Sequence, residues 1–288
     1  MATVNPSSCE SAGRVGFFNR RTRTLLLVAI CTAILIAVSV AGMVMDDSAI
    51  AMNLRAVRQP PSLRHPFGTD WIGRDMLCRT IMGLSRSIRI GVIAALTSSI
   101  VGAALGLAAA LFGPRADRLV QWLNDVAMSI PHLVFVMLVA ILFGKGATGI
   151  MMGIILTHWV RLTRLIRAEV LQLRNAQYVK AARDFGKSRL YIAVKHIIPH
   201  VFPQFCVGVI LLFPHAILHE ASITFLGFGL PPHVPAIGVI LSESMGYLST
   251  GLWWLAMLPG VALIVVVRFF DVIGDNLQML LDPRQAHN

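Results

Sequence analysis

Charged residues are scarce in this chain. Only 14% of its 288 residues are Asp, Glu, Lys or Arg, whereas 56% are hydrophobic and the mean hydropathy is +0.72. Soluble globular proteins carry about a quarter charged residues, so this composition excludes an ordinary soluble domain. It favours a protein that crosses a membrane several times.

Cysteine is equally sparse, with four residues (Cys9, Cys31, Cys78 and Cys206) and no CxxC pair. Two of them fall inside apolar stretches, which excludes both a disulfide framework and a cysteine zinc site. The net charge of +11 does not indicate nucleic acid, because the basic residues alternate with long apolar segments and no nucleic-acid motif is present. We expect lipid, and no nucleic acid, around this chain.

Complete catalytic motifs are also missing. Gly186-Lys187-Ser188 resembles the end of a phosphate-binding loop, but Ala181 stands where that loop needs glycine. His219-Glu220 begins a zinc-protease pattern, but Ile223 replaces its second histidine. We therefore predict that the chain is not an enzyme and binds no cofactor itself.

Six apolar stretches predict an all-α polytopic membrane protein. They cover residues 25–45, 90–112, 119–143, 150–160, 201–228 and 252–270. The predicted organisation is a tail (1–23), a first transmembrane helix (24–45), an arginine-containing loop with an interfacial helix (46–89), a transmembrane domain (90–274) that includes a hydrophilic loop (161–199), and a C-terminal tail (275–288). A cleaved signal peptide is the alternative for the first stretch, which is long for a signal core.

Lysine and arginine predict the orientation. With six spans, 17 of the 25 basic residues lie on the side of both termini, which favours cytoplasmic N and C termini. Seven arginines in residues 46–89 oppose this bias, and we assign 74–89 to a helix lying at the interface. The orientation depends on residues 150–160, the shortest stretch, crossing the membrane.

Glycine and proline predict how the spans pack and bend. Gly102 and Gly106 allow a neighbouring helix to approach closely. Pro131 predicts a kink in the third span, and Pro203 and Pro214 predict breaks in the fifth.

A hydrophilic segment separates the fourth and fifth spans. It reads QYVKAARDFG at 177–186 and ends in HIIP at 196–199. Gly186 allows a bend between two short helices, and Pro199 is expected where the chain re-enters lipid. An ordinary solvated loop is the simpler alternative.

This spacing resembles the "EAA" coupling loop of bacterial ABC import permeases, through which ATPase subunits act on the transmembrane subunits. The resemblance assigns ATPase coupling to Tyr178, Lys180, Ala181, Ala182, Gly186 and Pro199. Lys180 departs from the pattern, because the family usually carries Glu there. The implied mechanism is that ATP binding moves the short helix around 178–192 and rocks the spans between inward-open and outward-open states.

Three further blocks extend the resemblance. Residues 65–75, HPFGTDWIGRD, look like the GTDxxGRD signature of the second permease subunit of peptide and nickel importers. Residues 220–229 also match that family, and so does a C-terminal block made of 259–260, 274–277 and 281–284. The turn at 68–73 is expected to let Asp70 and Asp75 pair with arginines.

The resemblance implies a type I ABC permease in the bacterial inner membrane. Its expected partners are a homologous second permease, two ATP-binding subunits that hydrolyse ATP, and an extracytoplasmic solute-binding protein.

Histidines raise the question of substrate. His215 and His219 share one helix face beside Glu220, and His158 lies in the fourth span. Ionisable groups inside a membrane usually face a pathway, and imidazole is a ligand for Ni²⁺. These positions resemble those of nickel-type permeases, so nickel or a nickel chelate is our predicted cargo. Peptides are the alternative cargo, and a metalloenzyme using His215, His219 and Glu220 is a remote one. Helix packing is the simpler role for the histidines.

Overall fold

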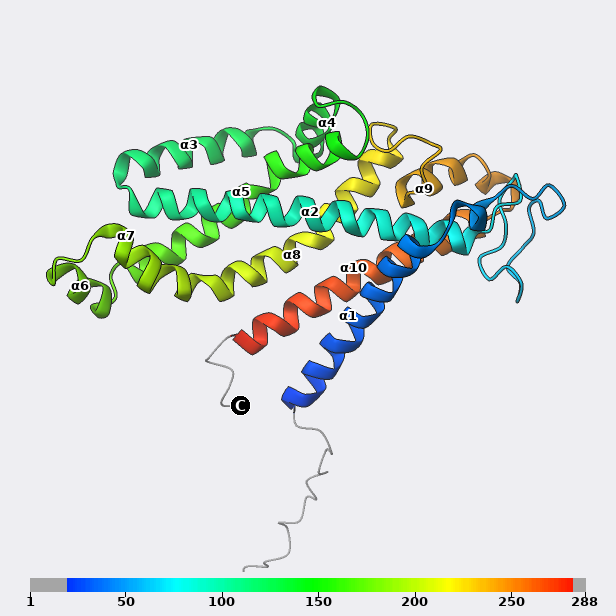
Figure 1. Ribbon diagram of the computed structural model, residues 1–288. Coiled ribbons are helices and arrows are strands. Elements are labelled where there is room, and N and C mark those ends of the chain that lie inside the picture. Colours follow the sequence, from blue (N-terminus) through cyan, green and yellow to red (C-terminus); the bar gives the residue numbers. More distant parts are fainter. Residues whose placement is uncertain (1–19, 282–288) are drawn as a thin grey trace, which may run out of the picture.

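The computed structural model describes residues 20–281, and within them the long elements are all helices, which confirms the predicted all-α class (Figure 1). Its elements are α1 (Arg20–Val44), η1 (Asp47–Ile50), α2 (Met76–Leu111), α3 (Pro114–Ser129), α4 (His132–Leu142), α5 (Ala147–Leu173), α6 (Gln177–Asp184), α7 (Arg189–Ile192), η2 (Ala193–Ile197), α8 (Ile198–Phe225), α9 (Ile237–Met245), η3 (Leu248–Thr250) and α10 (Trp254–Leu281). The predictions made for residues 1–19 and 282–288 lie outside the described residues.

Five helical segments are long and apolar enough to cross a membrane. They are α1, α2, α5, the continuous stretch from α7 to α8, and α10. A sixth span exists if α3 and α4 count as one, although these two helices meet at 95°. The third span predicted at 119–143 is thus two helices, and the kink predicted at Pro131 is present as this sharp bend. Ile130, before Pro131, has the extended backbone that a following proline favours, and this ends α3.

The fourth span is longer than predicted. Helix α5 does not end before Arg161 but continues to Leu173, giving 27 residues, or about 40 Å. Four apolar side chains at helical spacing are buried against neighbouring helices: Leu162, Ile166, Val170 and Leu173. Their burial continues the helix although arginines stand between them. The helix thus continues into the segment predicted as a hydrophilic loop from residue 161, and the chain leaves α5 near Arg174.

Three other boundaries also move. Helix α8 continues through Pro203 and Pro214, so the predicted breaks are wrong; neighbouring helices let membrane helices tolerate proline. The helix expected at 74–89 and the span expected at 90–112 form one 36-residue helix, α2. At about 54 Å, α2 exceeds the hydrocarbon core of about 30 Å. Helix α10 continues to Leu281, into the predicted tail.

Helices α2 and α5 pack closely, as the glycines predict. A methyl group on Gly102 would lie 2.7 Å from the carbonyl oxygen of Trp159, and one on Gly106 would lie 2.8 Å from that of Thr163. The Thr163 hydroxyl donates to the carbonyl oxygen of Gly102 at 3.0 Å. Small residues thus bring the two backbones together.

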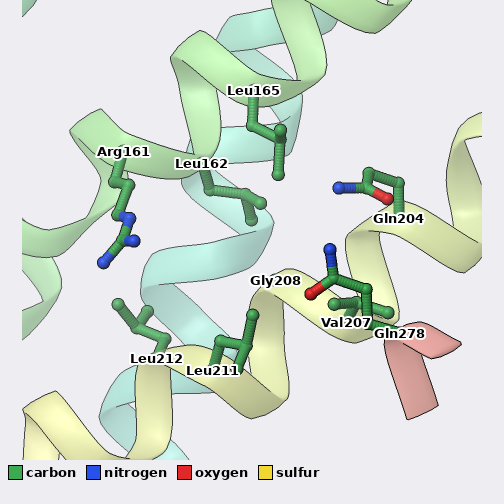
Figure 2. A pocket seen from close by; sticks show the side chains of 9 residues that line it. All are labelled: Arg161, Leu162, Leu165, Gln204, Val207, Gly208, Leu211, Leu212 and Gln278. Atoms are coloured by element: carbon green, nitrogen blue, oxygen red, sulfur yellow. The ribbon is translucent and has the colours of Figure 1, made fainter. Parts of the chain in front are cut away.

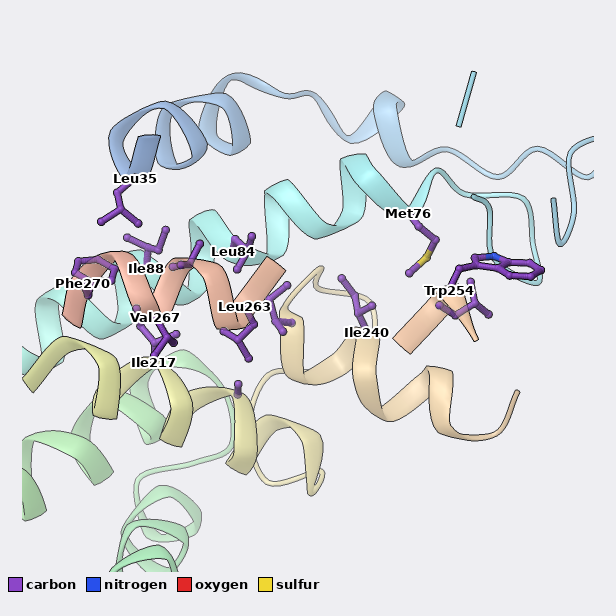
Figure 3. Close-up of a cluster of buried hydrophobic side chains, with 14 residues drawn as sticks. Leu35, Met76, Leu84, Ile88, Ile217, Ile240, Trp254, Leu263, Val267 and Phe270 are labelled. Atoms are coloured by element: carbon purple, nitrogen blue, oxygen red, sulfur yellow. The ribbon is translucent and has the colours of Figure 1, made fainter. Parts of the chain in front are cut away.

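The largest apolar cluster joins α1, α2, α8, α9 and α10 (Figure 3). Its members include Leu35 on α1, Ile88 on α2, Ile217 on α8, Ile240 on α9 and Phe270 on α10. The cluster ties the N-terminal helix to the last one. The start of α1 and the end of α10 point to the same side of the molecule as α6 and α7, away from residues 46–75 (Figure 1).

Candidate functional site

The turn predicted at 68–73 is formed. Gly68 and Gly73 both have positive φ, at 70° and 79°. The buried Asp70 carboxylate accepts hydrogen bonds from the backbone N–H groups of Ile72 at 3.0 Å and Arg74 at 2.8 Å. Asp75 does not pair with an arginine as predicted. It accepts from the N–H of Cys78 as the N-cap of α2 and lies 2.7 Å from Nδ1 of His65.

Beside this turn lies a group of ion pairs that we call the ion-pair cluster, made of Asp70, Arg74, Arg79 and Glu243. The Arg79 guanidinium is 2% exposed and contacts Asp70 at 3.1 Å and Glu243 at 2.8 Å. Arg74 Nε lies 2.5 Å from Asp70. Glu243 comes from α9, so the cluster fastens α9 to the beginning of α2. Sequence reasoning did not identify Glu243 as a partner.

At the opposite end of the molecule, α6 and α7 form a hairpin, residues 177–192, that we call the α6–α7 hairpin (Figure 1). Gly186 has a φ of +72° immediately after α6, which makes the predicted bend. Ser188 caps α7 by accepting from the N–H of Tyr191 at 3.2 Å. A five-residue π-helical stretch, Ala193–Ile197, then leads into α8, with Pro199 in its first turn.

One face of this hairpin is anchored in the protein. Val179 is fully buried among Leu173 of α5, Ile192 of α7 and Val201 of α8. The other predicted coupling residues are more accessible: Tyr178, Lys180, Ala181, Gly186 and Pro199 are exposed, and Ala182 is half-buried. The hairpin therefore combines a fixed inner side with an open outer side.

Sequence reasoning missed two exposed apolar side chains on the hairpin. Phe185 is 83% exposed and Leu190 is 74% exposed. Both stand within the polar segment, where an isolated large apolar residue was the available signal. They add apolar surface to a hairpin whose exposed charged side chains are largely basic.

A cavity of about 730 Å³ lies between α3–α4, α5 and α8. The predicted residues His158, His215 and His219 all line it, and so does His132, which we did not predict. His132 follows Pro131 at the start of α4, and only the sharp bend there brings it to the others. An ionisable residue inside a predicted span was the signal in the sequence.

Glu220 does not join this group. Its carboxyl group is fully buried, and Oε1 accepts from the Thr224 hydroxyl at 3.1 Å within the same helix. Because adjacent helix positions point about 100° apart, Glu220 turns away from the cavity that His219 lines. The metalloenzyme site of His215, His219 and Glu220 is therefore not formed.

A second cavity of about 460 Å³ lies between α5, α8 and the end of α10 (Figure 2). Arg161 and Leu212 line both cavities, which run along the same sides of α5 and α8. Gln204 and Gln278 supply further polar groups at its wall. In the described part of the chain, Arg161 forms no ion pair, whereas Arg164 contacts Asp125 at 3.3 Å.

Comparison with known proteins identifies the family. A sequence profile described as "Binding-protein-dependent transport system inner membrane component" matches residues 101–287. A putative peptide transport system permease protein of Brucella suis is 35% identical over 260 residues, covering 90% of this chain and 86% of the relative. The dipeptide transport system permease protein of Bacillus subtilis is 33% identical over 237 residues, covering 82% of this chain and 74% of the relative.

The fold agrees with this assignment. The MetNI methionine ABC transporter, solved in inward-facing conformations, contains a chain that superposes with a TM-score of 0.60 at 14% identity, over 72% of this chain and 98% of that one. This similarity shows a type I ABC importer permease fold. The chain therefore belongs to the inner-membrane components of binding-protein-dependent transport systems, as the permease subunit of an ABC importer.

Proposed function

We propose that this chain carries peptides across the bacterial inner membrane, driven by ATP-hydrolysing subunits that dock on the α6–α7 hairpin. The observation that carries the proposal is the two-sided hairpin: Phe185 and Lys180 are open to a partner, while Val179 is buried against the spans. A force applied to the outer side must pass through that buried contact.

The packing around Val179 supports this route. Its apolar cluster includes Ile166 and Val170 of α5 and Val201 of α8. The same two helices line both cavities. A rigid displacement of the hairpin would therefore move the cavity walls, which is how domain rocking exchanges inward-open and outward-open states. Lys180, in place of the usual Glu, calls for a complementary acidic group on the docking subunit.

Further partners follow from the same proposal. A homologous second permease would complete the pathway beside the two cavities that α5 and α8 line. The solute-binding protein would deliver cargo at the end that carries the ion-pair cluster. Both described ends of the chain then lie with the hairpin on the cytoplasmic side, in agreement with the basic residues (Figure 1).

Peptide is the proposed cargo because the relatives compared above are peptide permeases. The cavities, of about 730 and 460 Å³, fall within the size range of small-molecule sites. Arg161 stands where they meet and can pair with a peptide carboxylate. Our expectation of nickel as the cargo finds no support among these relatives.

Uptake by the assembled transporter tests the identity of the cargo and the need for ATP. In proteoliposomes containing the partner subunits and binding protein, labelled dipeptide should accumulate with ATP and radioactive nickel should not. Nickel uptake without dipeptide uptake would overturn the proposed cargo.

Coupling is tested with Gly186→Val, since a β-branched residue is strained at a φ of +72°. We expect loss of substrate-stimulated ATPase activity. Gly251→Val is the matched control, because Gly251 also has positive φ, at 85°, and no atom lies within 4 Å of the position that a Cβ would take there. Equal loss in both variants, or undiminished coupling in Gly186→Val, would contradict the assigned role of the hairpin.

A further inference from the structure

Three histidines from three helices meet at the wall of the larger cavity. His132 begins α4, His158 lies in α5 and His219 lies in α8. Their ring centroids are 4.6 Å apart for His132 and His158, 4.7 Å for His132 and His219, and 5.1 Å for His158 and His219. One nitrogen from each ring lies within 4.8 Å of the others. We call these residues the three-histidine cluster.

The hydrogen bonds of His158 leave one nitrogen available. Its Nδ1 lies 3.1 Å from the carbonyl oxygen of Ile154, to which it donates. Nε2 then carries the lone pair, and it is buried without a hydrogen-bond partner among the described residues. An imidazole whose Nδ1–H is held by a carbonyl and whose Nε2 is free has the arrangement of a metal-ligating histidine. Packing alone leaves this buried nitrogen unexplained.

The fold fixes the positions of the other two. The 95° bend between α3 and α4 sets the direction in which α4 starts, and His132 is its first residue. His219 lies near the C-terminal end of α8, one turn after His215. His215 lines the same cavity but is not part of the three-histidine cluster. Its Nδ1 lies 3.2 Å from the carbonyl oxygen of Leu211.

We propose that the three-histidine cluster binds a late first-row divalent ion, such as Zn²⁺, Co²⁺ or Ni²⁺, within the translocation cavity. Imidazole nitrogen suits these ions, whereas Mg²⁺ and Ca²⁺ prefer oxygen. With metal–nitrogen distances of about 2.0–2.1 Å, tetrahedral ligand nitrogens lie about 3.4 Å apart. Nitrogens that are now within 4.8 Å of one another must therefore approach by up to about 1.4 Å. Side-chain rotation of the exposed His132 and of the half-buried His219 toward His158 supplies that closure.

Three protein ligands leave at least one coordination position open toward the cavity. No carboxylate joins the cluster in the described part of the chain, and the cationic Arg161 lines the same cavity. Positive charge nearby weakens the hold on a dication. The site is therefore suited to an ion that arrives and leaves. This inference goes beyond the proposed function, because it does not require peptide to be the cargo.

The test is a Co²⁺ titration of the complete transporter in lipid nanodiscs after treatment with a chelator. Absorption bands of imidazole-bound Co²⁺ report the site directly, and metal analysis gives the stoichiometry. We expect His132→Ala, His158→Ala and His219→Ala each to weaken Co²⁺ binding at least tenfold. His132→Cys should restore part of it, because a thiolate is also a ligand.

His215→Ala is the matched control, since it removes a histidine from the same cavity one turn away, and its Co²⁺ affinity should stay within about twofold. His200→Ala, beside Glu169 on the exposed side of α8, should also bind normally. Basal ATPase activity checks that each complex assembles. If His158→Ala does not assemble, the Co²⁺ affinity of His132→Ala decides whether the site exists, because His132 is exposed.

Unchanged Co²⁺ bands in His132→Ala and His219→Ala would overturn the metal site, and so would equal losses in His215→Ala. Dipeptide uptake in the same preparation separates the two proposals. Uptake with no Co²⁺ site leaves the proposed function standing without this inference. A Co²⁺ site with no dipeptide uptake supports the metal site and contradicts the proposed function.

Discussion

Charged side chains are buried and paired at one end of this molecule and exposed at the other. At one end, the ion-pair cluster buries Arg79 and Asp70 and satisfies them within the chain. At the other, the charged side chains of the α6–α7 hairpin are exposed, and in the described part of the chain none of them forms an ion pair. The longest helix, α2, reaches from the first end toward the second (Figure 1).

The difference separates structure from interaction. A buried charge is tolerable only when its partners are supplied, and here Asp70, Arg74 and Glu243 supply them from the same chain. The hairpin is completed only on its inner side, through Val179. Its exposed apolar and basic groups therefore suit a separate partner. Substitutions should damage folding at the first end and docking at the second.

The largest effect on stability is expected for Arg79→Met. It leaves Glu243 and Asp70 with only Arg74, at 3.6 and 2.5 Å. We expect a loss of about 3 kcal/mol in the free energy of unfolding, at the lower end for a broken buried pair because Arg74 remains. Denaturant unfolding in detergent measures it. Arg86→Met, also on α2 but without an ion pair in the described residues, should cost less than about 1 kcal/mol. Equal losses of unfolding free energy in Arg79→Met and Arg86→Met would show that the ion-pair cluster does not stabilise the fold.

A smaller effect compares two glycines of like backbone conformation. Gly73 has a φ of +79°, and an added methyl carbon would overlap the carbonyl oxygen of Asn53. Gly186 has a φ of +72° with nothing within 4 Å. Alanine costs about 1 kcal/mol of backbone strain at either site, and crowding at Gly73 adds about 1–3 kcal/mol. The same unfolding measurement applies. A Gly186→Ala variant as unstable as Gly73→Ala would show that the hairpin is not open.

The smallest change in stability is expected for Phe185→Ala. Because this side chain is 83% exposed, the free energy of unfolding should shift by no more than about 0.5 kcal/mol. Affinity for the ATP-binding subunits should nevertheless fall about tenfold, as for a buried aromatic anchor at an interface. Binding of those subunits to the immobilised permease measures the fall.

Leu63→Ala is the control for this prediction, since Leu63 is fully exposed in the loop between η1 and α2, away from the hairpin. It should change neither stability nor ATPase binding. A loss of ATPase binding in Leu63→Ala as large as in Phe185→Ala would contradict docking at the hairpin.

Several features of the fold could be predicted from local residue patterns. Gly102 and Gly106 indicated a close helix contact, and the structure has one against α5. Gly68, Gly73 and Gly186 indicated turns, and all three have positive φ. These predictions succeeded because a glycine acts on the backbone at its own position or on the helix that touches it.

Other predictions failed where neighbours override local composition. Arg161 suggested the end of a span, but the buried Leu162 and Ile166 continue α5 past it. Pro203 and Pro214 suggested breaks, but α8 continues through both. In each case packing with other helices outweighs a local preference.

The sequence by itself determined that this protein is a helical membrane permease with a hydrophilic hairpin between two spans. Hydropathy and motif spacing are properties of neighbouring residues, so they can be read along the chain. Only the tertiary structure decided that His132 joins His158 and His219, and that Glu220 turns away from them. Those outcomes depend on the 95° bend at Pro131 and on the rotation of α8 about its axis, which packing sets and local composition does not.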